Sequence, residues 1–290
     1  LSGGDVRGTF TSLGHNLIGQ GDNAIGLTHG LNGDLVGTAA NRIDAMLGAL
    51  TDNGGPTKTH ALLANSPAID AGQADGVTLT DQRGLLRSLD GNGDGVRIPD
   101  IGAFERFLGF LVNSTLDTVD ANPGDGIAAD SLGRTTLRAA IMEANALSGA
   151  DTIIVPVGTY LLALAGIGED AAATGDLDIT GDTTILGYGS ATIIDAADLD
   201  RAFQVMSGKR LHLEGITLQN GHLTGAHGGA ISNAGTLEVI DSTLRDNDVT
   251  GASTKGGAIY NTGIVTLTDT QVTDNRADGS GAGLYNFGGT

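Results

Sequence analysis

The strongest constraint on the fold is a repeat in the last quarter of the chain. The hexapeptide GGAISN at 228–233 returns as GGAIYN at 256–261 and, altered, as GAGLYN at 281–286, with the asparagines 28 and 25 residues apart. A self-similar period of this length is typical of stacked structural units, each too small to bury its apolar face alone. The repeat therefore predicts a solenoid.

The residue types within the repeats favour strands. Short runs rich in β-branched residues alternate with Gly, Asn and Asp, which is typical of strands joined by tight turns. Apolar residues fall into columns when the repeats are superposed, namely Leu213, Val239 and Leu267, and then Leu218, Leu244 and Val272. We expect an all-β fold, a right-handed parallel β-helix in which strands of successive rungs pair about 4.8 Å apart.

Composition limits the core and the partners. Aromatic residues make up 3% of the chain and Trp is absent, so Val, Ile, Leu and Ala must fill a narrow interior. The net charge of −19, with only Lys58, Lys209 and Lys255 as lysines, argues against binding to nucleic acid or to an anionic membrane. No apolar run is long enough to span a membrane. The lack of Cys excludes disulfides and thiolate metal sites.

One helix is predicted, at about 136–147. Its apolar residues recur at helical spacing on one face, Thr135 or Thr136 can cap its start, and Ser148-Gly149 can end it. We expect this helix to cover the open end of the β-helix, because an uncovered rung exposes unpaired strand edges. Its charged residues Arg138 and Glu143 are interpreted as surface or cap contacts rather than catalytic groups. The predicted apolar face consists of Leu137, Ala140, Ile141 and Ala144.

Four motifs in the first hundred residues resemble a known class of protein. They are SLGHNLIGQGD at 12–22, LTDNGGPTKTHALLANSPAIDAG at 50–72, TDQRG at 80–84 and DIGAFE at 100–105. Together they resemble the closing region of bacterial β-helix surface proteins whose ends are described as choice-of-anchor domains. The resemblance implies that residues 1–107 are the last rungs and the C-terminal cap of a β-helix, in a secreted or surface-attached protein.

After a boundary near 106–109, the chain resembles the beginning of the same class of protein. Segments 110–126, 135–160 and 168–180 are similar to the N-terminal segment that is named for its Cys-Ser-Leu-Arg-Glu-Ala signature. Residues 108–290 are thus expected to hold the N-terminal cap and the rungs of a second β-helix. The resemblance implies Cys at positions 128 and 135 and Glu at position 139, where this chain has Ala128, Thr135 and Ala139. Any disulfide that those two Cys form in relatives is therefore absent here.

The two ends of the chain read as one continuous rung when they are joined. Placing Thr290 before Leu1 gives GLYNFGGTLSGGDVRGTFTSLGHNLIG. We therefore expect the chain to be one period of a tandem array. Its partners would be neighbouring repeats or further copies that associate end to end, with surface glycans as a further class of partner.

One loop has the pattern of a calcium ligand set. The sequence DGNGDG at 90–95 matches the first half of an EF-hand loop, in which alternate side chains converge on the ion. The second half departs, because Ile101 stands where a bidentate Glu is required and no helix pattern flanks the loop. Calcium and a plain Asx-rich turn both remain open. The candidate ligands are Asp90, Asn92 and Asp94, the carbonyl of Val96, and Asp100.

The alternative class of function is enzymatic. Parallel β-helices host enzymes that cleave polysaccharides, and these use acids, or an acid with a base, on one face. Asp241 and Asp269 form one column and Asp246 and Asp274 another, but Asp at rung turns is also ordinary turn chemistry. No catalytic residue is therefore assigned.

The remaining polar candidates are interpreted as structural. His60 is interpreted as a hydrogen-bonded structural residue, and Asn247 with Asn275 as a side-chain ladder. His222 and His227 form only a weak candidate metal pair.

The sequence as a whole favours a structural or adhesive β-helix from a bacterial cell surface or from the extracellular space, such as a stalk or filament. A carbohydrate-active β-helix enzyme is the alternative.

Overall fold

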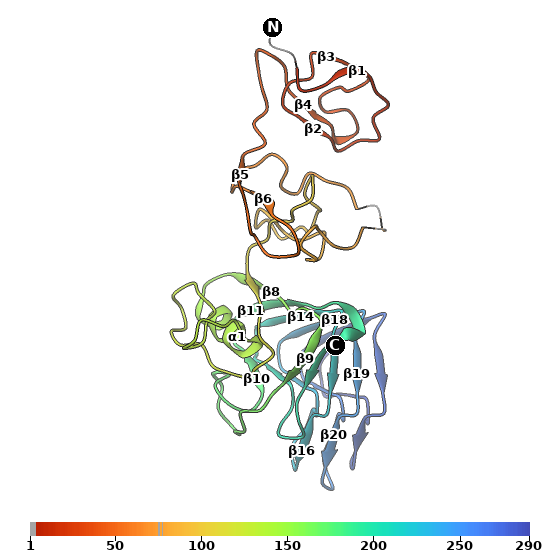
Figure 1. The fold of residues 1–290 in the computed structure, drawn as a ribbon. Coiled ribbons are helices and arrows are strands. Elements are labelled where there is room, and N and C mark those ends of the chain that lie inside the picture. Colours follow the sequence, from red (N-terminus) through yellow and green to blue (C-terminus); the bar gives the residue numbers. More distant parts are fainter. Residues whose placement is uncertain (1–3, 75, 77) are drawn as a thin grey trace. The chain divides into compact units, whose positions relative to one another are not determined.

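The computed structural model describes residues 4–74, 76 and 78–290, and the chain divides into two compact units, Leu1–Leu108 and Gly109–Thr290. The second unit is a parallel β-solenoid of about five turns, drawn from green to blue in Figure 1. Each turn adds one strand to each of several parallel sheets. The fold class expected from the repeats, a parallel β-solenoid with one short helix, is confirmed.

Four sheets make up the solenoid. The first contains β7 (Phe110–Leu111), β8 (Ala150–Ile154), β11 (Asp182–Leu186), β14 (Arg210–Glu214), β18 (Thr236–Ile240) and β22 (Ile264–Thr268). The second contains β9 (Gly158–Leu161), β12 (Thr192–Asp195), β15 (Thr217–Gln219), β19 (Thr243–Arg245) and β23 (Gln271–Thr273). The third contains β10 (Leu177–Ile179), β13 (Phe203–Val205), β17 (Ile231–Asn233), β21 (Ile259–Asn261) and β25 (Leu284–Asn286). The fourth contains β16 (His222–Thr224), β20 (Asp248–Thr250) and β24 (Arg276–Ala277).

The strand register reproduces the predicted apolar columns. Leu213 pairs with Val239 and Val239 with Leu267, while Leu218 pairs with Leu244 and Leu244 with Val272. Leu213, Val239, Leu218 and Leu244 are at most 1% exposed, so the columns form the interior of the coil. Leu267 lies on the edge strand β22 and is 38% exposed.

Helix α1 (Leu137–Ala146) packs against β8, β10 and β11, at the first-rung end of the solenoid (Figure 1). The hydroxyl of Thr136 accepts a hydrogen bond from the backbone N–H of Ala139 at 3.1 Å and caps the helix. All four residues of the predicted apolar face are buried. The expected capping helix is confirmed, because its apolar face supplies the cover that the first rung requires.

The first unit holds short strand pairs. β1 (Arg7–Thr9) pairs in parallel with β3 (Asn23–Ile25), β2 (Leu17–Ile18) pairs in parallel with β4 (Leu35–Val36), and β5 (Leu47–Thr51) pairs antiparallel with β6 (Thr59–Leu62). Its core is small, and its buried apolar side chains in the described part are Leu62, Ala68, Leu85 and Leu89. The interpretation of this unit as the closing region of a β-helix stays a prediction.

Candidate functional site

Two of the motifs singled out in the first unit meet in a buried network of charged side chains. In the TDQRG motif, the carboxylate of Asp81 accepts hydrogen bonds from Nε of Arg83 at 2.8 Å and from the backbone N–H of Glu105 at 3.0 Å. The guanidinium of Arg83 lies 3.6 Å from the ring centroid of Phe104, which belongs to the DIGAFE motif. The two motifs are therefore joined by an ion pair and a cation–π contact.

Glu105 is a fully buried acid of this network. Its Oε1 accepts the backbone N–H of Asp100 at 3.0 Å and pairs with Nη2 of Arg87 at 3.2 Å, while Oε2 has no hydrogen-bond partner in the described part of the chain. Burial, reinforced by the charge of Asp100 and opposed by Arg87, raises the pKa of Glu105 to about 7. Glu105 can therefore hold a proton near neutral pH.

Asp100 connects this network to a third motif, SPAIDAG at 66–72. Its carboxylate accepts the backbone N–H groups of Asp70 at 2.8 Å and of Arg106. Burial raises the pKa of both Asp70 and Asp100. Nδ1 of His15, from the SLGHN motif, lies 2.8 Å from the carbonyl oxygen of Ala71 and donates to it. All four motifs thus contribute to one framework, which indicates that they hold the unit together.

The predicted calcium loop adopts a series of Asx turns. Asp90 accepts the backbone N–H groups of Gly93 at 2.6 Å and Gly95 at 2.8 Å, Asn92 accepts that of Asp94 at 2.8 Å, and Asp94 accepts that of Val96 at 2.8 Å. The side chains of Asn92 and Asp94 are exposed.

Asp100 does not join this loop, because its buried carboxylate faces the network described above. The charges of Asp90 and Asp94 instead act on Asp70, which lies twenty residues before the loop and whose Oδ2 is buried without a partner in the described residues. No spacing in the sequence could have indicated Asp70.

The residues of the loop do not fit a calcium ion as they are arranged here. Within residues 4–74, 76 and 78–290, no group of three or more His, Cys, Asp or Glu side chains is placed to hold a metal. The carboxylate oxygens accept backbone N–H groups, which a bound cation would have to displace. Calcium binding at this loop therefore stays a prediction.

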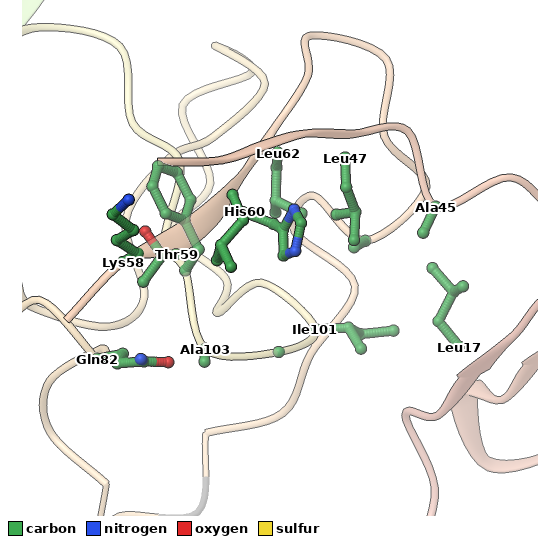
Figure 2. Close-up of a pocket in the computed structure, with 14 residues that line it drawn as sticks. Leu17, Ala45, Leu47, Lys58, Thr59, His60, Leu62, Gln82, Ile101 and Ala103 are labelled. Atoms are coloured by element: carbon green, nitrogen blue, oxygen red, sulfur yellow. The ribbon is translucent and has the colours of Figure 1, made fainter. Parts of the chain in front are cut away.

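A pocket of about 430 Å³ opens beside the β5–β6 hairpin (Figure 2). Figure 2 shows Lys58, Thr59 and Gln82 at one end, with Leu47 and Leu17 toward the other. Its volume falls within the range of about 300–1,000 Å³ that small-molecule sites have, and most of its lining is apolar. His60 lines it but donates from Nδ1 to the carbonyl of Gly48 at 2.7 Å, which fits a structural role. The lining also includes Ala45, Leu50, Leu62, Ala68, Ile101, Gly102, Ala103 and Phe104.

The acidic columns of the solenoid occupy turns with a left-handed backbone. Asp241 and Asp269 have φ of 47° and 48°, and Gly215, one rung earlier, has φ of 66°. Asp246 and Asp274 have φ of 56° and 55°. Gly, Asn and Asp are the residues that tolerate this conformation, so backbone geometry is enough to explain both columns.

The asparagine ladder predicted at 247 and 275 is present. Nδ2 of Asn247 donates to Oδ1 of Asn275 at 2.9 Å. A second ladder, inside the third sheet, runs from Asn233 to Asn261 at 2.6 Å and from Asn261 to Asn286 at 2.9 Å. The repeated Asn of the GGAISN hexapeptide was the signal that could have predicted this second ladder.

The two histidines of the candidate metal pair have separate surroundings. Nδ1 of His222 lies 3.4 Å from the carboxylate of Asp248, and the ring of His227 packs 4.6 Å from that of Tyr260. They belong to no metal-binding group in the described residues.

A cluster that the sequence reasoning missed lies on the first sheet. Nδ1 of His212 is 2.9 Å from Oε2 of Glu238, and its Nε2 is 3.2 Å from Oε2 of Glu214. Arg210 also donates to Glu238, at 2.6 Å. Because each ring nitrogen lies within hydrogen-bond distance of a carboxylate, His212 is held between Glu214 and Glu238. The spacing of 26 residues between His212 and Glu238, one period of the repeat, was the signal that could have paired them.

Arg138 and Glu143 on α1 are both fully buried cap contacts. Nε of Arg138 pairs with Asp117 at 2.5 Å, and its other nitrogens donate to the carbonyls of Ala172 at 2.8 Å and Gly175 at 2.9 Å. The carboxylate of Glu143 accepts backbone N–H groups from the loop at 124–126. The alternative, that they lie on the surface, is wrong, because the loops before and after α1 fold over them.

The comparisons with known proteins gave no match. No protein-family model, no curated protein and no solved structure matches this chain. Among the described residues, no helix is both long and apolar enough to cross a membrane. The motifs' likeness to bacterial surface proteins therefore stands as a resemblance, and what is shown is a parallel β-solenoid of about five turns.

Proposed function

We propose that the chain is a structural module of an extracellular or cell-surface β-solenoid protein, a rigid segment of a stalk or filament. The observation that carries this proposal is the unbroken register of the rungs. Each sheet adds strands in line, and stacked side chains, including the Asn233–Asn261–Asn286 ladder, repeat along the axis. Such ladders resist bending and shear because each rung is hydrogen-bonded to the next.

The proposal includes a right-handed coil. Connections between parallel strands of one sheet are right-handed in about 98% of cases. It also includes end-to-end contact with a further rung, from the same chain or from another copy. Within the described residues, β23 and β25 each pair with one strand in their sheets, so one side of each can pair again, whereas the free side of β22 already donates the N–H of Val265 to the carbonyl of Thr290.

The location and the family belong to the same proposal. The motifs of both units resemble segments of secreted or surface-attached bacterial β-helix proteins, and an acidic chain without Cys is compatible with that setting.

Electron microscopy of the native material tests the proposal. We expect unbranched rods with a regular axial repeat, and aligned rods that diffract at about 4.8 Å along their axis, the spacing of parallel rungs. Discrete compact particles without an axial repeat would remove the stalk and filament from consideration.

The second candidate, a carbohydrate-active β-helix enzyme, is favoured by the His212 cluster. His212 is 7% exposed and lies between two partly exposed glutamates, so the cluster combines an imidazole with two carboxylates of the kind that act as acid and base. Its test is the release of new reducing ends from acidic and neutral polysaccharides by the wild-type protein, compared with His212→Gln. Equal or absent release by both proteins contradicts catalysis by this cluster.

A further inference from the structure

Two tyrosines stack on the outer surface of the third sheet. Ser232, Tyr260 and Tyr285 are in register on β17, β21 and β25. The residues before and after Tyr260, Ile259 and Asn261, are buried, so Tyr260 and its partners in the column point outward. The rings of Tyr260 and Tyr285 lie 6.0 Å apart, centroid to centroid, with their planes 6° from parallel.

Other side chains extend this stack at both ends. The ring of His227 packs 4.6 Å from that of Tyr260. Nζ of Lys255 lies 4.5 Å from the ring centroid of Tyr285 and 5.5 Å from that of Phe287, and it donates to the tyrosine hydroxyl at 3.2 Å. These five residues, His227, Lys255, Tyr260, Tyr285 and Phe287, are named the aromatic ridge.

The composition of the ridge is unusual for this chain. The protein has four Tyr, six Phe and no Trp, and the ridge gathers two of the Tyr and one Phe on the surface. Phe287 is 58% exposed, and the other four are partly exposed. Stacking between rungs aligns the two tyrosines, and Phe287 lies beside them on the same rung as Tyr285.

Lys255 adds a local positive charge. It is one of three lysines in a chain of net charge −19, and in the described part of the chain no carboxylate forms a salt bridge with it. Its ammonium rests on two rings instead, which leaves its charge available to an anion. The complement of this surface is a ligand that carries both a carboxylate and a flat apolar face.

We propose that the aromatic ridge binds an acidic polysaccharide, one built of uronic acid residues. Sugar rings present apolar C–H faces to the aromatic side chains, a uronate carboxylate pairs with Lys255, and the tyrosine hydroxyls hydrogen-bond to sugar hydroxyls. The rungs repeat about every 4.8 Å along the solenoid, which is comparable to the length of one sugar residue. A linear polymer lying along the axis would meet the tyrosines of two successive rungs.

The net negative charge does not prevent this binding. At physiological salt, charges more than about 8 Å apart are largely screened, so the local charge of Lys255, rather than the net charge of the chain, governs the contact with a carboxylate. The contact of Lys255 with Tyr285 also holds the two side chains in place before the ligand arrives. This inference deepens the proposed surface scaffold by naming what the scaffold would adhere to.

Calorimetric titration of the full chain tests the inference, with hexamers of galacturonate, mannuronate and glucuronate as probes and cellohexaose as the neutral reference. We expect at least one uronate hexamer to bind, and Lys255→Gln and Tyr285→Ala to weaken that binding at least tenfold. Lys209→Gln is the matched control and should bind as the wild type does. The affinity should also fall as salt is raised, because an ion pair contributes to it.

Three results would overturn the inference: no uronate hexamer binds the wild type, both ridge variants bind as well as the wild type, or cellohexaose binds as tightly as the uronates. Circular dichroism of each variant checks folding, and Lys255→Gln carries the test if Tyr285→Ala does not fold. Electron microscopy separates the two proposals. Rods without binding contradict only the ridge, and binding by compact particles contradicts only the scaffold.

Discussion

Residues at equivalent turns of successive rungs share one rare backbone conformation. Gly256 and Gly281, like Gly228 in the first copy of the hexapeptide, have φ between 66° and 72°. In the first two copies of the hexapeptide a second glycine follows, Gly229 or Gly257. It packs against the backbone of the next rung, where a Cβ would overlap a carbonyl oxygen. The hexapeptide repeats because only glycine meets both requirements.

The first prediction concerns Gly257. Gly257→Ala should lower the free energy of unfolding by about 1–3 kcal/mol, because its methyl group would push apart the backbones of neighbouring rungs. Urea unfolding followed by circular dichroism measures the change. Gly48→Ala is the control, since a Cβ there meets only ordinary contacts and its φ is not positive. Equal unfolding midpoints for wild type and Gly257→Ala would contradict the argument.

The second prediction concerns the buried acids near α1. Burial, reinforced by the charges of Asp176, Glu169 and Asp170, raises the pKa of Asp178 to about 7, and burial raises that of Asp176 to about 6. These folded-state pKa values lie above the ordinary value of 3.8. The folded protein therefore binds more protons than the unfolded chain between about pH 4 and 7.

Stability should accordingly fall as pH rises from about 4 to about 7. Asp178→Asn should lose less stability than the wild type between pH 5 and pH 8, because one buried charge no longer has to form. The measurement is urea unfolding at both pH values. Asp269→Asn, an exposed turn residue, should follow the wild type. An unchanged pH dependence in Asp178→Asn would show that Asp178 is not the source.

At the scale of elements, α1 is held in place by buried ion pairs and hydrogen bonds. Arg138 ties Asp117 and the carbonyls of Ala172 and Gly175 to the helix, and Glu143 ties the loop at 124–126. The stability of the cap therefore depends on buried charged groups, and removing one would leave its partner buried without a counter-charge or a hydrogen bond.

The third prediction follows from Arg138. Arg138→Ala should destabilise the protein by about 3–5 kcal/mol, because the buried Asp117 and two carbonyls lose their partner. Arg245→Ala is the matched control: the side chains of Arg245 and its partner Asp246 are 41% and 44% exposed, so the expected loss is about 0–1 kcal/mol. Chemical unfolding measures both variants. Equal losses would contradict the assignment of Arg138 as the central contact of the cap.

The fourth prediction concerns the loop at 90–96. If calcium binds there, it must displace the Asx turns and should raise the melting temperature relative to the chelated protein. The double variant Asp90→Ala with Asp94→Ala should then abolish the difference. The measurement is thermal unfolding of both proteins in calcium and in chelator. Identical unfolding curves for the wild type in the two conditions would contradict calcium binding at this loop.

At the scale of the whole molecule, the two units differ in how much apolar surface they bury. The continuous core, from Val112 to Ile259, lies entirely within the second unit, whereas the first relies on its charged network. Apolar burial is the main source of cooperative stability, so the units should not be equally stable.

The fifth prediction is that amide hydrogens of β5 and β6 exchange faster than those of β14 and β18. The reason is that β14 and β18 each have a hydrogen-bonded neighbour on both sides, whereas β5 and β6 pair only with each other. Hydrogen exchange read by mass spectrometry, with peptides from both units in one sample, makes the comparison. Equal protection in the two units would contradict it.

The sequence by itself determined the solenoid, its apolar columns and the capping helix. These features depend on local periodicity: a repeat of 25 to 28 residues places Leu213 on Val239, and helical spacing places Leu137 and Ile141 on one face. The asparagine ladder from Asn247 followed from the same arithmetic.

Only the tertiary structure decided which charged residues meet. Asp81 reaches Glu105 across 24 residues, Arg138 reaches Gly175 across 37, and Asp100 turns toward Asp70 rather than toward the loop beside it. Whether a side chain enters a turn, a buried ion pair or an aromatic stack depends on how distant loops fold over it. The spacing of residues in the sequence does not predict these contacts, because contact and burial are properties of the folded chain.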